Sequence, residues 1–388
     1  MAKSNKRKYF FILFFTSPLW VILMSYLFWK FQAKTPINAV IVDKAVLNQQ
    51  CNEHRSFNWM LDHKGYSLDS NSYYSPPRDY YGFFPKKDQK FILNDFEKMS
   101  SLDIENFADS VDILYYTDTY GIYRNEWYKT GSDLEHSQKV YGGLTLKDYT
   151  LIESCIARQI PVITEFNLLA SPTSTNIRKK TEELLNIKWT GWTGRYFEDL
   201  DTNKNKEIPR WVINLQLDQY DNVWDFKKSG IVFVSNTSKI VIIENKRHLN
   251  SEFPHIICSD YGQEEYSISK KTTYPFWFDI TFSTDTCMKE IASYEIKTND
   301  EGSKKLNLHG IPKSFPAILM KEHPSPVFYF CGDFCDNPIK YSNRKFKGIE
   351  YISFLFDKPK NKSDRSHFFW RVYEPMMSRF LDKYLPQE

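Results

Sequence analysis

The stretch RQIPVITEFNLLASPTS, residues 158 to 174, decides the fold. Its first half contains PVIT, a short run rich in β-branched residues, which is typical of a buried strand. Its second half is a turn rich in Ser, Thr, Asn and Pro, and STNIRKKTEELLNI (174–187) follows with helical spacing. A strand that passes through a tight turn into a helix is where many α/β enzymes hold a nucleophile. Here neither a cysteine nor a Gly-x-Ser-x-Gly pattern lies at the turn.

The residues before this elbow alternate between strand and helix patterns. INAVIVDKAV (37–46) and SVDILYYTDTYGIY (110–123) contain β-branched or apolar runs that predict strands. HRSFNWMLDHKGY (54–66) and TLKDYTLIESCIARQ (145–159) have the apolar spacing of helices, the second with Thr145 as its N-cap. Residues 67 to 89, rich in Tyr and Pro, predict a long ordered loop. This order predicts an α/β fold with a flavodoxin-like, mostly parallel central sheet flanked by helices.

The pattern changes after the elbow. WTGWTGRYFEDLDTNKNKEIPRW (189–211) has no periodicity, whereas residues 230 to 245 alternate around a turn and predict a hairpin. Further strands are expected at residues 255–260, 292–298, 325–334 and 348–356. The chain ends in an apolar-faced helix at residues 366 to 385, interrupted or restarted at Pro375. We therefore expect one domain over residues 37 to 388, with an elaboration at about 201 to 310.

The N-terminus predicts a membrane anchor. Residues Tyr9 to Trp29 form an apolar run without a charge, about the length that crosses a bilayer. The four preceding cations, Lys3, Lys6, Arg7 and Lys8, predict that residues 1 to 8 form a cytoplasmic tail. No A-x-A-like cleavage site follows, so residues 9 to 30 are expected to stay as a signal anchor. The rest of the chain would then lie outside the cytoplasm, in the periplasm if the cell has an outer membrane.

Charge and composition limit the classes of partner that the protein is expected to bind. Without the four cations of the tail, the formal net charge of +3 becomes −1 for residues 9 to 388, which argues against nucleic acid as a partner. Aromatic residues make up 17% of the chain, enough either for a large core or for a surface that stacks on sugar rings. The six cysteines are sparse and irregularly spaced, which leaves one or two disulfides open. Cys331 and Cys335 lack a second ligand pair, so we expect neither a metal nor a cofactor.

The order of elements and the stretch RQIPVITEF resemble the class I glutamine-amidotransferase-like fold, including its trehalose-utilisation-type relatives. In catalytic members a helix leads into a strand of K-P-V-L-G-I-C character, and the cysteine stands at the elbow. The register places Glu165 or Phe166 at that position. PAILMKEHPSPVFYFCGDF (316–334) resembles the late strand pair of the trehalose-utilisation-type branch. The resemblance covers residues 37 to 200 and 310 to 388.

The sequence departs from that family at the residues that carry its chemistry. The His-x-Glu near the last strand is missing, and FLFDKPK (354–360) has Asp357 in that neighbourhood. Cys155 lies within the preceding helix, where its thiol would not reach the elbow. A nucleophilic thiolate needs a base or a helix dipole to lower its pKa. Glutamine hydrolysis by this machinery is therefore not expected.

Acidic residues follow several of the expected strands. In open α/β sheets ligands bind beyond the carboxyl ends of the strands, where we expect Asp118, Glu165 and Asp333 to share one site as catalytic candidates. The ligand-binding candidates around them are Asp43, His54, Arg55, Tyr120, Asn167, Thr173, Trp192 and Arg195. Carboxylates grouped in this way perform general acid–base chemistry on glycosidic or ester bonds, or bind sugar hydroxyls.

Each candidate also has a structural explanation. Asp43 and Asp118 are residue types that cap turns, His54 and Arg55 open a helix, and the tryptophans beside Gly turns at 189 to 195 are also typical packing anchors. Ser171 and Ser174 have no identifiable base. Glu165 is the hardest to explain as a cap.

Three functions fit these features. The first is a membrane-anchored, non-catalytic amidotransferase-like module that binds an envelope glycan or an envelope-biogenesis partner. The second is a hydrolase of a glycan or ester that uses the strand-end carboxylates. The third is a structural subunit of an envelope complex.

Overall fold

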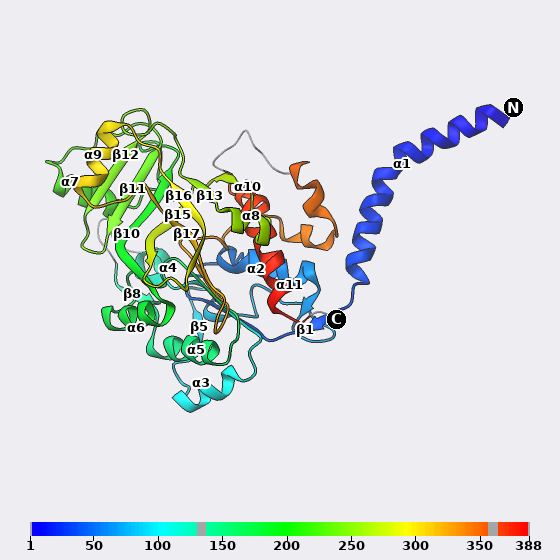
Figure 1. The fold of residues 1–388 in the computed structure, drawn as a ribbon, viewed down its shortest axis with the longest axis horizontal. Helices are drawn as coiled ribbons and strands as arrows, with labels where there is room; N and C mark the ends of the chain where they lie inside the picture. Colours follow the sequence, from blue (N-terminus) through cyan, green and yellow to red (C-terminus); the bar gives the residue numbers. More distant parts are fainter. Residues whose placement is uncertain (1, 130–136, 356–363, 387–388) are drawn as a thin grey trace.

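A computed structural model describes residues 2–129, 137–355 and 364–386, with side chains from residue 16 onward. A central sheet of ten strands has the order β14-β13-β16-β17-β18-β9-β6-β2-β4-β5 (Figure 1). The five strands from β18 to β4 are mutually parallel, and the strands outside them pair antiparallel. The elbow stretch contains β9 (Val162–Glu165). On one side of β9 the sheet continues with β18 (Val327–Phe330), β17 (Ser314–Lys321), β16 (Lys289–Glu295), β13 (His255–Cys258) and β14 (Lys271–Thr273). On the other side of β9 it continues with β6 (Ile113–Asp118), β2 (Ala39–Asp43), β4 (Tyr81–Pro85) and β5 (Phe91–Asn94).

The strand of the elbow stretch lies inside this parallel part. β9 pairs with β18 on one side and with β6 on the other, and all four of its residues are buried. The expected α/β fold with a parallel core flanked by helices is thereby confirmed.

Helices cover both faces of the parallel strands, as the alternation of side chains along β6 demonstrates. The ring of Tyr115 meets Phe57 of α2 (Asn52–Lys64), with the ring centroids 4.8 Å apart. The next residue, Tyr116, points to the opposite face, where its hydroxyl meets Asp148 of α5 (Leu146–Ala157). The helices α3 (Ser101–Ala108) and α6 (Thr175–Leu185) pack on α5, while α8 (Asp260–Tyr266) and α11 (Glu374–Tyr384) lie on the side of α2.

A second, antiparallel sheet has the order β12-β11-β10-β15. Its strands are β10 (Ile187–Phe197), β11 (Gly230–Ser235), β12 (Ile240–Glu244) and β15 (Trp277–Ser283). Phe278 of β15 packs on Tyr294 and Phe315, which belong to the antiparallel side of the central sheet. The predicted hairpin at 230 to 245 is confirmed as β11 and β12.

The remaining elements are short apart from the N-terminal helix. They are α1 (Ala2–Lys30), α4 (Arg124–Tyr128), α7 (Arg210–Gln219), α9 (Asp300–Leu308), α10 (Ser366–Phe368), the 3₁₀ helices η1 (Tyr341–Lys345) and η2 (Ile349–Leu355), the π-helical turn η3 (Phe369–Tyr373), and the paired strands β1 (Thr35–Pro36) with β3 (Tyr66–Ser67) and β7 (Ile122–Tyr123) with β8 (Lys139–Tyr141). As expected, the α-helical pattern of the C-terminal helix is interrupted near Pro375: the π-helical turn η3 ends at Tyr373, and α11 begins at Glu374.

Three expectations about secondary structure were wrong. Residues 67 to 89 are not all loop, because β4 pairs there with β2 and ends at Pro85. The aperiodic stretch after residue 188 is mostly the long strand β10, whose β-bulge between Trp189 and Thr193 breaks the two-residue alternation. Residues 349 to 355 of the expected strand form η2, and residue 356 lies outside the described part.

Within the described residues, none of the helices has both the length and the apolar character that are needed to span a bilayer. The expected anchor at residues 9 to 30 lies partly outside that part, because side chains before residue 16 are not described. The anchor stays a prediction.

Candidate functional site at the carboxyl edge of the parallel strands

Acidic residues stand side by side where the parallel strands end. Asp43 of β2 pairs in register with Asp118 of β6, and Glu165 of β9 pairs with Phe330, three residues before Asp333. The sheet therefore brings the four predicted acids to one edge, as the sequence indicated. Whether Asp118, Glu165 and Asp333 act on one ligand stays a prediction.

The Glu165 side chain is almost fully buried and bonded at both oxygens. Oε1 accepts a hydrogen bond from the hydroxyl of Tyr115, and Oε2 accepts from the backbone amides of Phe334 (2.9 Å) and Cys335 (3.3 Å). Burial raises the pKa of Glu165 well above its usual range, although these three bonds act in the opposite direction. Glu165 thus fixes the loop after β18, which carries Asp333 and Asp336.

Asp118 is half-buried beside the elbow. Its Oδ1 accepts from the backbone amide of Tyr120 (2.6 Å) and from Nδ2 of Asn167 (3.5 Å). Burial first, and then the charge of Asp43, raises the pKa of Asp118 to about 7. Asn167 has φ of 66°, a left-handed conformation that Asn adopts more readily than most residues. Asp118 therefore caps its turn and still keeps contact with solvent.

Asp43 and His54 form a buried pair. Nδ1 of His54 lies 2.5 Å from Oδ2 of Asp43, and Nε2 lies 2.8 Å from the carbonyl oxygen of Pro76. Since a carbonyl and a carboxylate both accept, the imidazole donates from both nitrogens and is cationic. Burial by itself lowers the pKa of His54, but the bond to Asp43 and its charge raise the pKa overall. Both side chains are fully buried, so they tie α2 to β2 instead of facing a ligand.

Two further acids, which sequence reasoning missed, join this edge. Glu53 is half-buried, and burial followed by the charge of Asp43 raises its pKa to about 8. The carboxylate of Asp336 lies 3.4 Å from the guanidinium of Arg365. The pKa of Asp333 is raised well above its usual range, first by burial and then by the charges of Asp336 and Glu165. Glu53 precedes His54 and Asp336 follows Asp333 by three residues, so proximity in the sequence was a usable signal.

Three arginines lie near this edge, and the charge of Arg365 acts to lower the pKa of Asp333. Arg365, which no sequence pattern indicated, lies over the ring of Phe276 at 3.5 Å. Arg195 donates to Glu207 (2.7 Å) and lies over the rings of Phe276 and Trp277. Burial lowers the pKa of Arg195 overall, although Glu207 and, to a smaller extent, Asp333 act in the opposite direction. Nη2 of Arg55 donates to the carbonyl of Asn337 (3.4 Å), while its buried Nε has no partner among the described residues.

Three predicted ligand-binding residues have other surroundings. Thr173 is buried, and its Oγ1 donates to the carbonyl of Leu168 and accepts from the amide of Leu144, both at 2.9 Å. Trp192 is buried and lies three residues before Arg195 on β10, hence on the opposite face of that strand. Tyr120 stays next to Asp118 through its backbone amide, but its half-buried ring lies beside Tyr123, with the centroids 5.0 Å apart.

Among the described residues, the other nucleophile candidates near the elbow have structural roles. Ser174 caps α6, and Asp357 lies outside the described residues. Cys155 is buried within α5, as expected, and burial raises its pKa to about 12. All six cysteines are free in the described part of the chain, and burial also raises the pKa of Cys335, whose Sγ accepts from the Tyr373 hydroxyl (3.3 Å).

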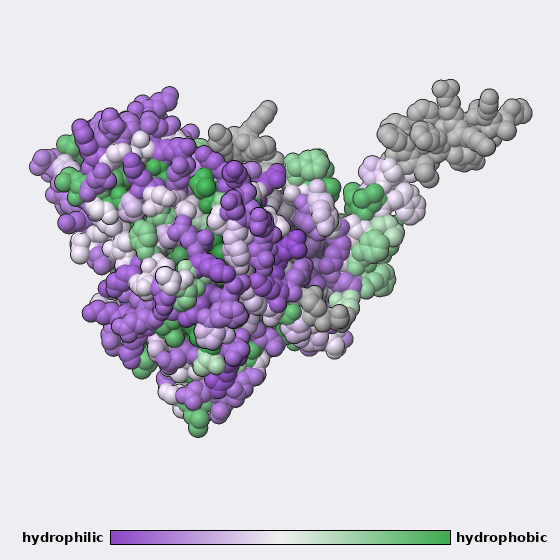
Figure 2. All heavy atoms as spheres, in the orientation of Figure 1, coloured by the Kyte–Doolittle hydropathy of each residue, from purple (hydrophilic) through white to green (hydrophobic). Residues whose placement is uncertain are grey.

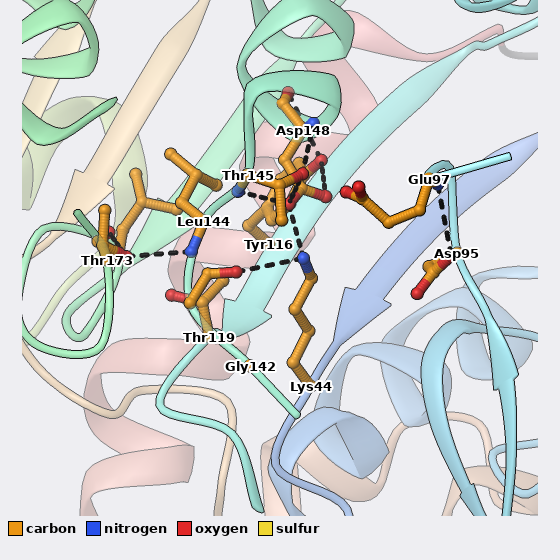
Figure 3. A network of polar contacts seen from close by, with 12 residues as sticks. Lys44, Asp95, Glu97, Tyr116, Thr119, Gly142, Leu144, Thr145, Asp148 and Thr173 are labelled. Atoms are coloured by element: carbon orange, nitrogen blue, oxygen red, sulfur yellow. Dashed lines mark hydrogen bonds and ion pairs between the residues drawn. The ribbon is translucent and has the colours of Figure 1, made fainter. Parts of the chain in front are cut away.

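A separate buried ion pair lies on the α5 face of the same strands (Figure 3). The ammonium of Lys44, next to Asp43, binds the carboxylate of Asp148 and donates to the carbonyl of Gly143 (3.1 Å). Tyr116 donates to the other oxygen of Asp148 (3.1 Å), and Thr145 completes the capping box. This network fixes the start of α5.

Comparisons with known proteins find likeness in structure alone. Neither a protein-family model nor a curated protein matches the chain. Among solved structures, a ThuA-like protein from Bacteroides uniformis has 9% identity and a TM-score of 0.33, over 89% of this chain and 98% of that one. A glutamine amidotransferase from Thermotoga maritima has 9% identity and a TM-score of 0.31, over 91% of this chain and 100% of that one. At these identities and TM-scores, neither likeness carries an argument about this chain.

Proposed function

We propose that this chain is an amidotransferase-like protein that binds a hydroxyl-rich ligand, a carbohydrate of the cell envelope, at the carboxyl edge of its parallel strands. The observation that carries the proposal is the grouping of the half-buried acids Glu53, Asp118, Asp333 and Asp336. They come from three separate segments, and they influence one another's charge state.

The chemistry of this edge suits sugar hydroxyls. Carboxylates accept hydrogen bonds from hydroxyl groups, and guanidinium groups donate to the remaining oxygen lone pairs. Arg195 and Arg365 supply donors beside the half-buried rings of Phe276 and Trp277, which offer an apolar face for stacking. The number of carboxylates favours a neutral carbohydrate over an anionic ligand.

The location follows from the sequence. In this proposal residues 9 to 30 anchor the chain in the cell membrane, with the N-terminus in the cytoplasm and the binding edge outside it. A membrane-held, carbohydrate-binding edge would keep the protein at the envelope glycan or at a protein that makes or exports it.

Hydrolysis of a glycan or ester is the second candidate. It is favoured by Asp118, whose pKa of about 7 makes its carboxyl group a competent general acid at neutral pH. A neighbouring carboxylate would act as base or nucleophile, and the separation of the two groups would set the stereochemical outcome.

Calorimetric titration of the full chain in mild detergent with envelope-derived neutral oligosaccharides tests the proposal. Binding should weaken at least about tenfold, or 1.4 kcal/mol, in Asp118→Asn and Asp336→Asn. Asp218→Asn, an exposed change on α7, is the matched control and should bind like the parent. Release of reducing ends would identify the hydrolase, and equal binding by all variants would contradict a site at this edge.

A further inference from the structure

An apolar surface stands out on the short helix η2. Tyr351, Ile352, Phe354 and Leu355 expose 82, 43, 61 and 65% of their surface. The other side of η2 is held by the protein: Ile349 is buried, and the Glu350 carboxylate lies 3.3 Å from Nε2 of His63. Four large apolar side chains are therefore presented outward by a segment whose polar contacts are already made.

This surface lies beside α1. The Ser25 hydroxyl donates to the carbonyl of Lys347 (2.7 Å), and the Lys347 amide donates to the carbonyl of Ser25 (3.3 Å). Figure 1 shows η1 and η2, in orange, alongside the lower part of α1. On α1 the exposed apolar residues are Leu19, Trp20, Val21, Ile22, Leu23, Met24 and Phe28. Figure 2 shows hydrophobic side chains on both segments on this side of the molecule.

The end of α1 is fixed to the domain at the same level. Nε1 of Trp29 donates to Asp62 (3.2 Å), and its ring stacks on Tyr73 with the centroids 5.7 Å apart. Trp29, the last residue of the apolar run, is thus buried in protein. The bilayer boundary must then lie before Trp29, near Ser25, which bonds to Lys347 two residues before η2 begins.

Charge and residue type fit a membrane interface. Lys340 is exposed at the start of η1, and Lys345 lies partly exposed over the Trp29 ring (5.4 Å). Cations beside exposed aromatic and aliphatic side chains are typical of segments that lie in the headgroup region. A domain held against a bilayer by α1 has a lipid surface as the nearest cover for η2.

We infer that η2 inserts its four exposed apolar side chains into the interfacial region of the phospholipid bilayer that α1 enters. The inference rests on the membrane anchor in the proposed function. It adds a second, monotopic contact that orients the carboxyl edge of the sheet relative to the membrane.

Collision accessibility of nitroxide probes tests it on the full chain in phosphatidylethanolamine–phosphatidylglycerol nanodiscs. The background is Cys287→Ser, which removes the exposed cysteine. Probes are placed through Ile352→Cys and Phe354→Cys, through Leu308→Cys as an 81% exposed control on α9, and through Ile22→Cys to report on the anchor. Melting curves of the variants are the control that these surface changes leave the fold intact.

The expected result is a several-fold higher ratio of oxygen to nickel-chelate accessibility at 352 and 354 than at 308, because oxygen concentrates in lipid. Nickel accessibility equal to that at 308, with the probe at 22 in lipid, overturns the inference and leaves the anchor intact. Shielding of 352 and 354 from both reagents indicates a second copy or a protein partner and also overturns it. A probe at 22 that is open to nickel overturns the anchor and this inference together.

Discussion

The carboxylate of Glu165 accepts a 2.9 Å hydrogen bond from the backbone amide of Phe334, which joins the end of β9 to the loop after β18. The elbow thus holds a carboxylate that organises the neighbouring loop. Because Tyr115 donates to the other oxygen, both carboxylate oxygens of Glu165 are bonded within the protein. The sequence favoured it as a functional group, and the contacts favour a positioning role.

Glu165→Ala should destabilise the fold. The substitution leaves two buried backbone amides without their acceptor, and it leaves the Tyr115 hydroxyl with only Tyr373 at 3.5 Å; each lost partner costs about 1–3 kcal/mol. We expect the free energy of unfolding to fall by roughly 3 kcal/mol in urea titrations of the full chain. Glu53→Gln, a half-buried change at the same edge, should cost much less. An unchanged melting temperature together with lost ligand binding would return Glu165 to the ligand-contacting residues.

Stability should decrease as pH rises from about 5 to 8. The pKa values of Glu53 and Asp118 are raised to about 8 and about 7, so the folded chain keeps protons that the unfolded chain releases. The unfolded state then binds fewer protons, and the free energy of unfolding falls with pH. The raised pKa of His54 acts in the same direction, since its stabilisation is present at low pH and is lost as the imidazolium deprotonates.

Scanning calorimetry at a series of pH values checks this slope. Glu53→Gln removes one of the contributing groups and should make the fall in melting temperature shallower, whereas Asp218→Asn should not. Glu322, whose pKa is lowered to about 2 chiefly by its bond to Lys289, titrates below this window. A melting temperature that rises between pH 5 and 8 would contradict the assignment.

The sequence predicted the parallel core because its signals are local. VIT (162–164) is a continuous β-branched run, and Thr145 caps α5 with its own side chain. β10 was not predicted because a bulge disrupts the two-residue alternation of its side chains. η2 was predicted as a strand because its residues are apolar and β-like, but in the described structure no strand pairs with them and they form a 3₁₀ helix. Strand ends likewise located Asp118 and Asp333. The sequence could not indicate Arg365, because its contact with Asp336 spans 29 residues. Nor could it show which carboxylates accept their hydrogen bonds from other groups of the protein.

Asn167 should tolerate glycine better than a β-branched residue. Its φ of 66° lies in the left-handed region, where Gly is unstrained and Val is strongly disfavoured. Asn167→Gly should change the free energy of unfolding by less than about 1 kcal/mol, whereas Asn167→Val should cost about 1–3 kcal/mol. Urea denaturation of both variants measures the difference. Equal losses would show that the amide bond to Asp118 matters more than the backbone conformation.

Breaking the Lys44–Asp148 pair should be among the most costly single changes on the α5 face. Both side chains are buried, and Lys44→Met leaves the Asp148 carboxylate without its cation, which typically costs about 3–5 kcal/mol. Lys44→Met combined with Asp148→Asn leaves no unpaired charge, and the amide oxygen can still cap α5. We therefore expect the double variant to recover part of the loss in urea denaturation. The control is Lys297→Met, which breaks the 3.5 Å pair between a 47% exposed lysine and the 38% exposed Glu295 and should cost about 0–1 kcal/mol. A double variant no more stable than Lys44→Met would show that packing around the lysine, instead of charge compensation, maintains this part of the fold.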